Sequence, residues 1–299
     1  MQNSEAYLKP SVVQSIKRLD LKAQFIVKGF MHGLHSSPLQ GFSVEFSEHR
    51  KYERGDDPKD LDWVLYARTD KYYVKKYEAE TNMTGWLVVD SSASMGSAAN
   101  GERVTKFDYA ISLAAALCYL MISRQDPVGL ATFGEKLGKS LPPRSKRSQF
   151  GSVLSTLAQL RPAGETNVAH SLAQLAGMLK RASLIMIFSD LLGDPEETLR
   201  AIYRLRHAGH DVIIFHILDD AEARFPFQGT VELEDPETGE TMVVDAEAVR
   251  DDYLKSLDAF RERFRREGSR AKFDFVELDV TIPFDKALLE YLTARAARK

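Results

Sequence analysis

The sequence has 299 residues, of which 44% are hydrophobic and 28% charged, and its formal net charge is -3. This composition is typical of a globular protein and excludes a disordered or fibrous chain. The charge gives no reason to expect nucleic-acid binding, which depends on a basic surface. The single cysteine, Cys118, excludes an intrachain disulfide and favours a reducing compartment.

Membrane insertion is also not expected. The longest strongly apolar segment, residues 113–122, is about half as long as a segment that crosses a bilayer. The first residues lack the basic start and apolar centre of a secretory signal. We therefore expect a cytoplasmic protein, with residues 104–124 forming a core helix.

The first 83 residues are expected to form a charged leader segment that packs on the main domain. Helical spacing after a proline predicts a helix over 10–30, and a short helix and a half-exposed strand are predicted over 58–66 and 72–80. Residues 45–62 are dense in both signs of charge, with aromatic residues among them. This stretch suits either an ion-pair network that fixes the leader or a surface that docks a partner.

From residue 84 onward, strands and helices alternate. Strands are predicted over 86–90, 126–133, 183–188 and 211–218, and helices over 104–124, 149–160, 168–180 and 196–208. The apolar run Leu87, Val88 and Val89 lacks alternation, which is typical of a strand covered on both faces. We therefore predict an α/β fold with a doubly wound, mostly parallel sheet. A further edge strand over 136–141 is expected to stop before Pro142, because proline cannot donate to a ladder.

The C-terminal part departs from this alternation. Segments 230–233 and 241–244 flank the turn sequence Asp235-Pro-Glu-Thr-Gly, which predicts a hairpin insertion at about 219–250. A long charged helix over 246–267, a strand over 272–280 and a closing helix over 283–297 follow. The main domain is thus expected to cover 84–299.

Oxygen-bearing side chains lie at the ends of two predicted strands and within one predicted loop. They are Asp90, Ser92 and Ser94, then Thr166, and then Asp190. Ligands bind at the carboxyl ends of strands in α/β sheets, and hydroxyls and carboxylates suit a hard cation such as Mg²⁺. Each segment also has a structural explanation, because Asp and Ser are good caps. Thr166 suits the N-cap of the next helix, and Asn167 suits it equally well.

Taken together, these segments resemble a known site. The Asp90-Ser91-Ser92-Ala93-Ser94 loop, the Gly164-Glu165-Thr166-Asn167 loop and the strand end Ser189-Asp190 are similar to the metal-ion-dependent adhesion site of von Willebrand factor A domains. The resemblance covers about residues 84–218. It implies a Rossmann-like fold in which Asp90, Ser92, Ser94, Thr166 and Asp190 hold Mg²⁺, or Mn²⁺ in its place. A partner would then supply a carboxylate to the metal.

The leader extends this resemblance. Its charged segment 50–63, followed by Ala67-Arg68, is similar to an uncharacterised bacterial family, the domain of unknown function 58. That family is associated with MoxR-type AAA+ ATPases. The resemblance implies a chaperone-like interaction protein that acts with such an ATPase in assembling or activating other proteins. This sequence departs from the pattern at Glu165, where a glycine is common, and in lacking the membrane-spanning segments of many relatives.

An enzyme is the alternative, namely a Mg²⁺-dependent phosphohydrolase with Asp90 as nucleophile. Such chemistry usually needs a second acid two residues on, where this chain has Ser92, and the sequence indicates no lysine that would hold the phosphate. The chain contains no Gly-x-Ser-x-Gly string, dinucleotide fingerprint or Walker loop. We therefore expect a binding module without catalytic residues, in which His170, His207, His210 and His216 are structural.

Overall fold

The computed structural model describes residues 18–24, 26–27, 49–51, 66, 72–75, 84–97, 104–284, 286 and 288. Contacts divide the chain into a small unit, Leu34–Asn82, and a large unit that contains the rest. In the small unit, β1 (His49–Lys51) pairs antiparallel with β2 (Tyr73–Lys75), so a strand occurs inside the stretch that is dense in charge. Strand β2 lies within the strand predicted over 72–80, and residues 19–24 and 26–27 of the helix predicted over 10–30 are helical. The other parts of these predicted elements lie outside the described residues.

The large unit is built on a six-stranded sheet with the order β10-β7-β6-β3-β4-β5. Its strands are β3 (Gly85–Asp90), β4 (Val128–Phe133), β5 (Leu137–Arg144), β6 (Leu184–Ser189), β7 (Asp211–Leu218) and β10 (Asp274–Asp279). All neighbours are parallel except β4 and β5. Every residue of β3, β4 and β6 is buried, as the apolar runs predict. The doubly wound, mostly parallel α/β fold is confirmed.

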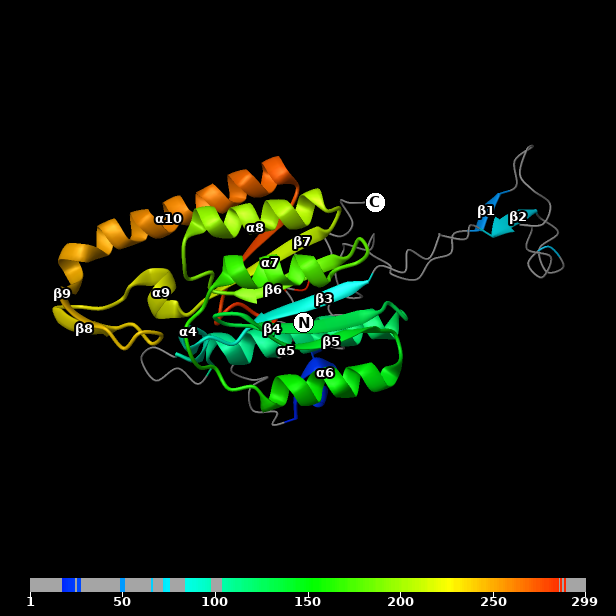
Figure 1. The fold of residues 1–299 in the computed structure, drawn as a ribbon, viewed down its shortest axis with the longest axis horizontal. Helices are drawn as coiled ribbons and strands as arrows, with labels where there is room; N and C mark the ends of the chain where they lie inside the picture. Colours follow the sequence, from blue (N-terminus) through cyan, green and yellow to red (C-terminus); the bar gives the residue numbers. More distant parts are fainter. Residues whose placement is uncertain are drawn as a thin grey trace, which may run out of the picture. The chain divides into compact units, whose positions relative to one another are not determined.

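Helices cover both faces of this sheet (Figure 1). On one face lie α5 (Lys106–Ser123) and α6 (Arg147–Gln159), and on the other lie α7 (Val168–Met178), α8 (Pro195–His207) and α10 (Ala246–Ala271). The core between sheet and second layer includes Val88, Ile187, Leu172, Ile202 and Phe264. On the first face, the helical segment within 18–27 places Ala23 against Ala115 and Leu154.

Helix α5 is the predicted core helix. It is the one helix among the described residues that is long and apolar enough to cross a membrane, but 72% of its apolar window is buried in the protein. Cys118 is buried within it. The helix begins after Thr105, whose hydroxyl accepts a hydrogen bond from the Asp108 amide at 3.0 Å. The cytoplasmic location remains a prediction.

Strand β5 corrects one expectation. It continues through Pro142 and Pro143 to Arg144, which pairs with Val128, so the predicted stop before Pro142 is wrong. The reason is that β5 is the outer strand of the sheet and its pairing with β4 contains register shifts. A proline is tolerated at such an edge because its missing N–H need not face the neighbouring strand.

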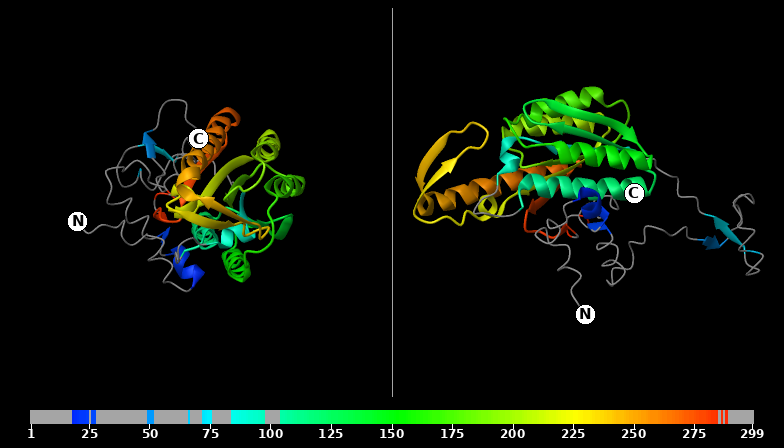
Figure 2. Two further views of the ribbon diagram at one scale, coloured as in Figure 1. Left: turned by 90° about the vertical axis from the view of Figure 1, so that its left-hand side faces the viewer. Right: turned by 90° about the horizontal axis from the view of Figure 1, so that it is seen from below.

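The predicted hairpin is confirmed. Strands β8 (Thr230–Glu234) and β9 (Thr241–Asp245) pair antiparallel in a sheet of their own. They extend beyond the main sheet as an arm whose tip lies beside the short helix α4 (Ala93–Gly96) (Figure 2). A second short helix, α9 (Asp220–Arg224), follows β7. Only residues 284, 286 and 288 of the predicted closing helix are described in helical form.

The strand order explains where a ligand can bind. From β3 the chain builds outward through β4 and β5, and then returns to place β6 on the other side of β3. The connections that leave β3 and β6 therefore diverge, and this opens a crevice at the carboxyl ends of these two strands. Asp90 is the last residue of β3, and Asp190 directly follows β6. The fold thus brings both predicted carboxylates to one crevice.

Candidate functional site

Asp90 is completely buried and both of its carboxylate oxygens accept hydrogen bonds. The Ser92 amide donates to Oδ1 at 3.0 Å, and the Ser189 hydroxyl donates to Oδ2 at 2.6 Å. Burial and the nearby charge of Asp190 raise the pKa of Asp90 to about 7, although the bonds from Ser189 and Ser92 act in the opposite direction. Ser189 directly precedes Asp190, so its bond to Asp90 joins the ends of β3 and β6.

The two predicted hydroxyls of the loop after β3 lie side by side. Ser92 Oγ lies 3.0 Å from Ser94 Oγ, and both side chains are buried. Ser94 also helps to lower the pKa of Asp190. The hydroxyls therefore connect the loop after β3 to the carboxylate after β6.

Backbone hydrogen bonds connect the threonine loop, residues 163–167, to the first loop, residues 91–94. The Ala93 amide donates to the Gly164 carbonyl, and the Ala163 amide donates to the Ser91 carbonyl, each at 2.9 Å. Gly164 has a φ of +76°, a left-handed conformation that favours glycine. These bonds fix the threonine loop beside Ser92 and Ser94.

The structure separates the two explanations of Thr166. Asn167 is the N-cap of α7, and its Oδ1 accepts the His170 amide at 2.9 Å. The Thr166 hydroxyl is not needed for capping, and its oxygen is buried without a hydrogen-bond partner among the described residues. A buried hydroxyl without a partner costs free energy, so this oxygen is available for a ligand.

Asp190 pairs with a lysine that we did not predict as part of the site. Lys106 Nζ lies 2.8 Å from Asp190 Oδ2 and 2.5 Å from Glu222 Oε1, and the Lys106 and Asp190 side chains are fully buried. Burial alone would raise the pKa of Asp190, but Lys106, Ser94 and the Leu192 amide more than offset it, so the pKa is lowered. Asp190 is therefore held in its ionised form.

Lys106 itself stays charged. Burial would lower its pKa, but Asp190 and Glu222 raise it above the usual lysine value. Glu222 also closes a capping box in α9, because its Oε2 accepts the Asp219 amide while Asp219 accepts the Glu222 amide. Lys106 thus joins the start of α5 to the loop after β6 and to α9.

His216 supports the same loop from the neighbouring strand. Its Nε2 lies 3.1 Å from the Asp190 carbonyl oxygen, and its ring stacks on Phe275. Burial, followed by the positive charge of Arg261, lowers the pKa of His216 to about 4. The ring is therefore neutral at physiological pH, and it contacts the backbone of the loop after β6.

With this geometry established, the relatives of the chain can be considered. Residues 48–263 match the family model described as "Protein of unknown function DUF58". The chain belongs to the DUF58 family. An uncharacterized protein of Mycobacterium tuberculosis is 30% identical over 258 residues, which cover 84% of this DUF58 chain and 80% of the relative. The predicted family membership is confirmed.

Two solved structures are similar to the DUF58 chain. A conserved hypothetical protein BatB from Bacteroides thetaiotaomicron has 17% identity and a TM-score of 0.46, with 72% of this chain and 99% of that one covered. The SpRpn10 VWA domain has 16% identity and a TM-score of 0.38, with 69% and 93% covered.

A metal ion in this DUF58 chain would rely on few carboxylates. Among the described residues, no group of three or more His, Cys, Asp or Glu side chains is arranged to hold a metal. The crevice nevertheless offers two adjacent carboxylates, the Ser92 and Ser94 hydroxyls and the unpaired Thr166 hydroxyl. Mg²⁺ keeps several waters and needs only one or two carboxylates. The five predicted residues therefore fit a divalent cation.

The lysine also changes how the phosphohydrolase alternative is judged. The sequence indicated no lysine that would hold the phosphate, and the structure brings one lysine, Lys106 of α5, to Asp190. Its ammonium is, however, engaged by Asp190 and Glu222 and is therefore not free to hold a phosphate.

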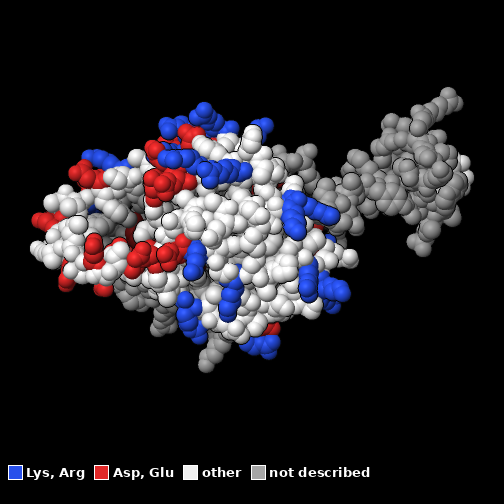
Figure 3. All heavy atoms as spheres, viewed as in Figure 1, with Lys and Arg blue, Asp and Glu red and all other residues white. Residues whose placement is uncertain are grey.

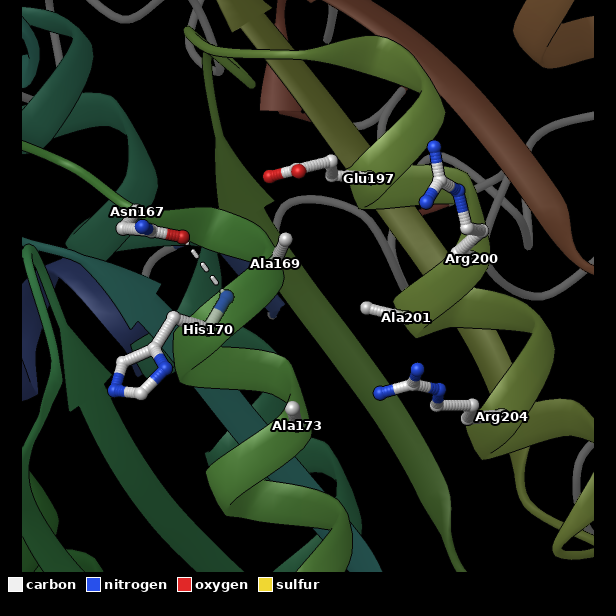
Figure 4. Close-up of a pocket in the computed structure, with 8 residues that line it drawn as sticks. All are labelled: Asn167, Ala169, His170, Ala173, Glu197, Arg200, Ala201 and Arg204. Atoms are coloured by element: carbon white, nitrogen blue, oxygen red, sulfur yellow. Dashed lines mark hydrogen bonds between the residues drawn. The ribbon is translucent and has the colours of Figure 1, made fainter.

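A groove of about 350 Å³ lies beside the threonine loop, between α7 and α8 (Figure 4). Asn167 borders it, and Glu197, Arg200 and Arg204 reach it from α8. None of the five predicted site residues lines this groove. The groove is therefore a feature next to the candidate site and not part of it.

Proposed function

We propose that this protein is a Mg²⁺-dependent interaction module in which Asp90, Ser92, Ser94, Thr166 and Asp190 hold the ion. The observation that carries the proposal is the buried Thr166 hydroxyl, which has no hydrogen-bond partner among the described residues although Asn167 already caps α7. Two ionised aspartates and neutral hydroxyls leave coordination places on Mg²⁺ for water or for a carboxylate. The ion would bridge two proteins and would not catalyse a reaction.

The charge of the crevice supports a cation. Asp190 and Glu222 share the ammonium of Lys106, and Asp90, which has no ion pair with that lysine, adds a further carboxylate. One divalent ion would balance the remaining negative charge and relieve the repulsion between Asp90 and Asp190. Ionised Asp190 and the raised pKa of Asp90 then imply that binding releases a proton from Asp90 at neutral pH.

A partner of this module is proposed from the family resemblance alone. A MoxR-type AAA+ ATPase would act with the protein in assembling or activating client proteins, and a carboxylate of the client or of the ATPase would complete the metal coordination. Copurification of an ATPase with the wild-type protein, and its loss in the Ser92→Ala, Ser94→Ala double variant, would support this role.

Thermal unfolding with and without Mg²⁺ tests the metal site directly. At a free Mg²⁺ concentration of 100 times Kd, binding stabilises the folded state by about 2.7 kcal/mol, which corresponds to an increase of several degrees in Tm. Asp90→Asn should abolish this increase, whereas Asp251→Asn, an identical change at an exposed position of α10, should retain it. The compared quantity is the Mg²⁺-dependent change in each variant, because removing a buried charge alters Tm by itself.

The enzymatic alternative is tested with the same proteins. Turnover of p-nitrophenyl phosphate in the presence of Mg²⁺ that is lost in Asp90→Asn and kept in Asp251→Asn would overturn the binding proposal. We expect no turnover above the buffer rate for any of the three proteins, because the Lys106 ammonium is engaged by Asp190 and Glu222 and is not free to hold a phosphate.

A further inference from the structure

The tip of the β8–β9 hairpin is a defined turn. Asp235 accepts the Glu237 amide at 2.8 Å through Oδ1 and the Thr238 hydroxyl at 3.0 Å through Oδ2. Asp235 also exchanges backbone hydrogen bonds with Gly239 and Glu240, and Gly239 has a φ of +74°. The turn therefore fixes the direction in which Glu237 leaves the backbone.

Glu237 reaches the candidate metal site. Its Oε2 accepts a hydrogen bond from the Thr166 amide at 2.8 Å, across 71 residues of sequence. The other oxygen, Oε1, is buried and has no hydrogen-bond partner among the described residues. The Thr166 hydroxyl is in the same condition. Two buried oxygens without partners thus belong to residues in direct contact, at the edge of a site that already holds two aspartates.

A cation is a ligand that both the Glu237 Oε1 and the Thr166 Oγ1 atoms could coordinate. A buried carboxylate oxygen without a partner is costly. A divalent ion bound by Asp90, Asp190 and the hydroxyls would turn this cost into coordination. The place that a partner's carboxylate is proposed to fill would then be filled by a carboxylate of the same chain.

We propose that Glu237 is an internal ligand of the metal ion and that the β8–β9 hairpin closes the site until a partner displaces it. This inference rests on the proposed function. The intramolecular carboxylate competes at an effective concentration that is about millimolar for a short flexible connection. A single free carboxylate would rarely exceed it, so a partner must also bind elsewhere.

The hairpin has the properties of a displaceable arm. Its base is held by the Arg250 guanidinium, which donates to the Phe225 and Phe227 carbonyls, and by the Ala246 amide, which donates to the Gly229 carbonyl. The strands beyond the base carry little burial, and Met242 and Val243 are 64% and 66% exposed. An isolated two-stranded hairpin is only marginally stable. The Glu237 contact is therefore a principal attachment of the tip.

The surface charge favours Glu237, rather than a partner's carboxylate, as the ligand that completes the metal site. Figure 3 shows acidic side chains gathered at the end of the large unit that bears the hairpin, and Glu232, Glu234 and Glu240 are exposed on the hairpin. Such a field attracts cations and slows the approach of an acidic partner. Glu237 does not have to approach through this field, because it already contacts the Thr166 amide.

Mn²⁺ binding followed by water proton relaxation tests the inference, because the enhancement depends on the number of exchangeable waters on the bound ion. We expect the Mn²⁺ complex of Glu237→Ala to show a higher enhancement per bound ion than the wild-type complex, and an affinity weaker by roughly 10- to 100-fold. Acetate should lower the enhancement of the Glu237→Ala complex and leave that of the wild-type complex unchanged. Glu240→Ala, which removes an exposed acid from the same turn, should behave as wild type in every measurement.

Two further results would overturn the inference in different ways. If Glu237→Ala binds Mn²⁺ with wild-type affinity and enhancement, Glu237 is not a ligand, and the metal site of the proposed function stands. If the wild-type protein binds no Mn²⁺, the proposed function fails together with the inference. Far-UV circular dichroism of each variant establishes that its fold is intact, and Glu237→Gln, which keeps an acceptor for the Thr166 amide, separates loss of the charge from loss of the turn contact.

Discussion

The Lys106 ammonium lies 2.8 Å from Asp190 Oδ2, and both side chains are fully buried although 84 residues separate them in the sequence. Lys106 also contacts Glu222 at 2.5 Å. The three residues come from the start of α5, the loop after β6 and α9. One ammonium thus joins three connections at the carboxyl end of the sheet.

Replacing this ammonium should strongly destabilise the fold. Lys106→Met leaves Asp190 buried without its cation, and breaking a buried ion pair in this way costs about 3 to 5 kcal/mol. Denaturant unfolding followed by circular dichroism, in the presence of EDTA, measures the change. Lys255→Met is the control, because this lysine of α10 is 76% exposed and such substitutions usually change stability by less than about 0.5 kcal/mol. Equal stability of Lys106→Met and Lys255→Met would contradict the prediction.

The strand ends of the site could be predicted from sequence because their signals are local. An apolar run followed by Asp90 marks the end of β3, and a second run followed by Ser189 and Asp190 marks the end of β6. Parallel strands place such ends at one edge of the sheet. The metal-binding role of Thr166 was implied by the family resemblance and not by the apolar pattern of the strands.

The remaining members of the site depend on tertiary packing. Lys106 gives one usable signal, a cation in the first turn of an apolar helix, where the helix dipole disfavours it. Such a lysine needs a carboxylate nearby, but the sequence does not say which one. Glu237 gives no signal of this kind, because its contact depends on how the hairpin folds back toward the threonine loop.

Thr166 should separate metal binding from folding. Thr166→Val keeps the shape of the side chain and the backbone amide that bonds Glu237, but removes the hydroxyl that has no partner. An unpaired buried polar group costs about 1 to 3 kcal/mol, so the metal-free variant should be at least as stable as wild type. Its affinity for Mg²⁺, measured by isothermal titration calorimetry, should fall by about tenfold, which is about 1.4 kcal/mol.

The matched control for that change is Thr132→Val. Thr132 is buried in β4, and its hydroxyl donates to the Lys139 carbonyl of β5 at 3.5 Å and to no residue of the proposed site. We expect this variant to bind Mg²⁺ as the wild type does. If Thr166→Val is strongly destabilised without metal, its hydroxyl has a structural partner, and the role assigned to it is wrong.

His216 should make the fold sensitive to mild acid. Its pKa is lowered to about 4 in the folded state, whereas an unfolded histidine has a pKa of about 6.5. Between these values the unfolded chain binds more protons, so stability is lost as the pH falls from about 6.5 towards 4. The full effect is about 3 kcal/mol at 1.36 kcal/mol for each pKa unit. The raised pKa of Asp90 acts in the opposite direction over an overlapping range, so the wild-type pH profile alone does not isolate this term.

A difference measurement isolates it. Denaturant unfolding of wild type and His216→Gln, at several pH values between 4 and 7.5 in EDTA, gives two profiles in which the Asp90 contribution is shared. Glutamine keeps a side-chain amide that can donate to the Asp190 carbonyl, as His216 Nε2 is placed to do. The wild type should lose stability relative to His216→Gln as the pH falls, and His207→Gln, at an exposed position of α8, should follow the wild type. Parallel profiles for wild type and His216→Gln would mean that the buried ring takes up a proton as readily in the folded state as in the unfolded chain.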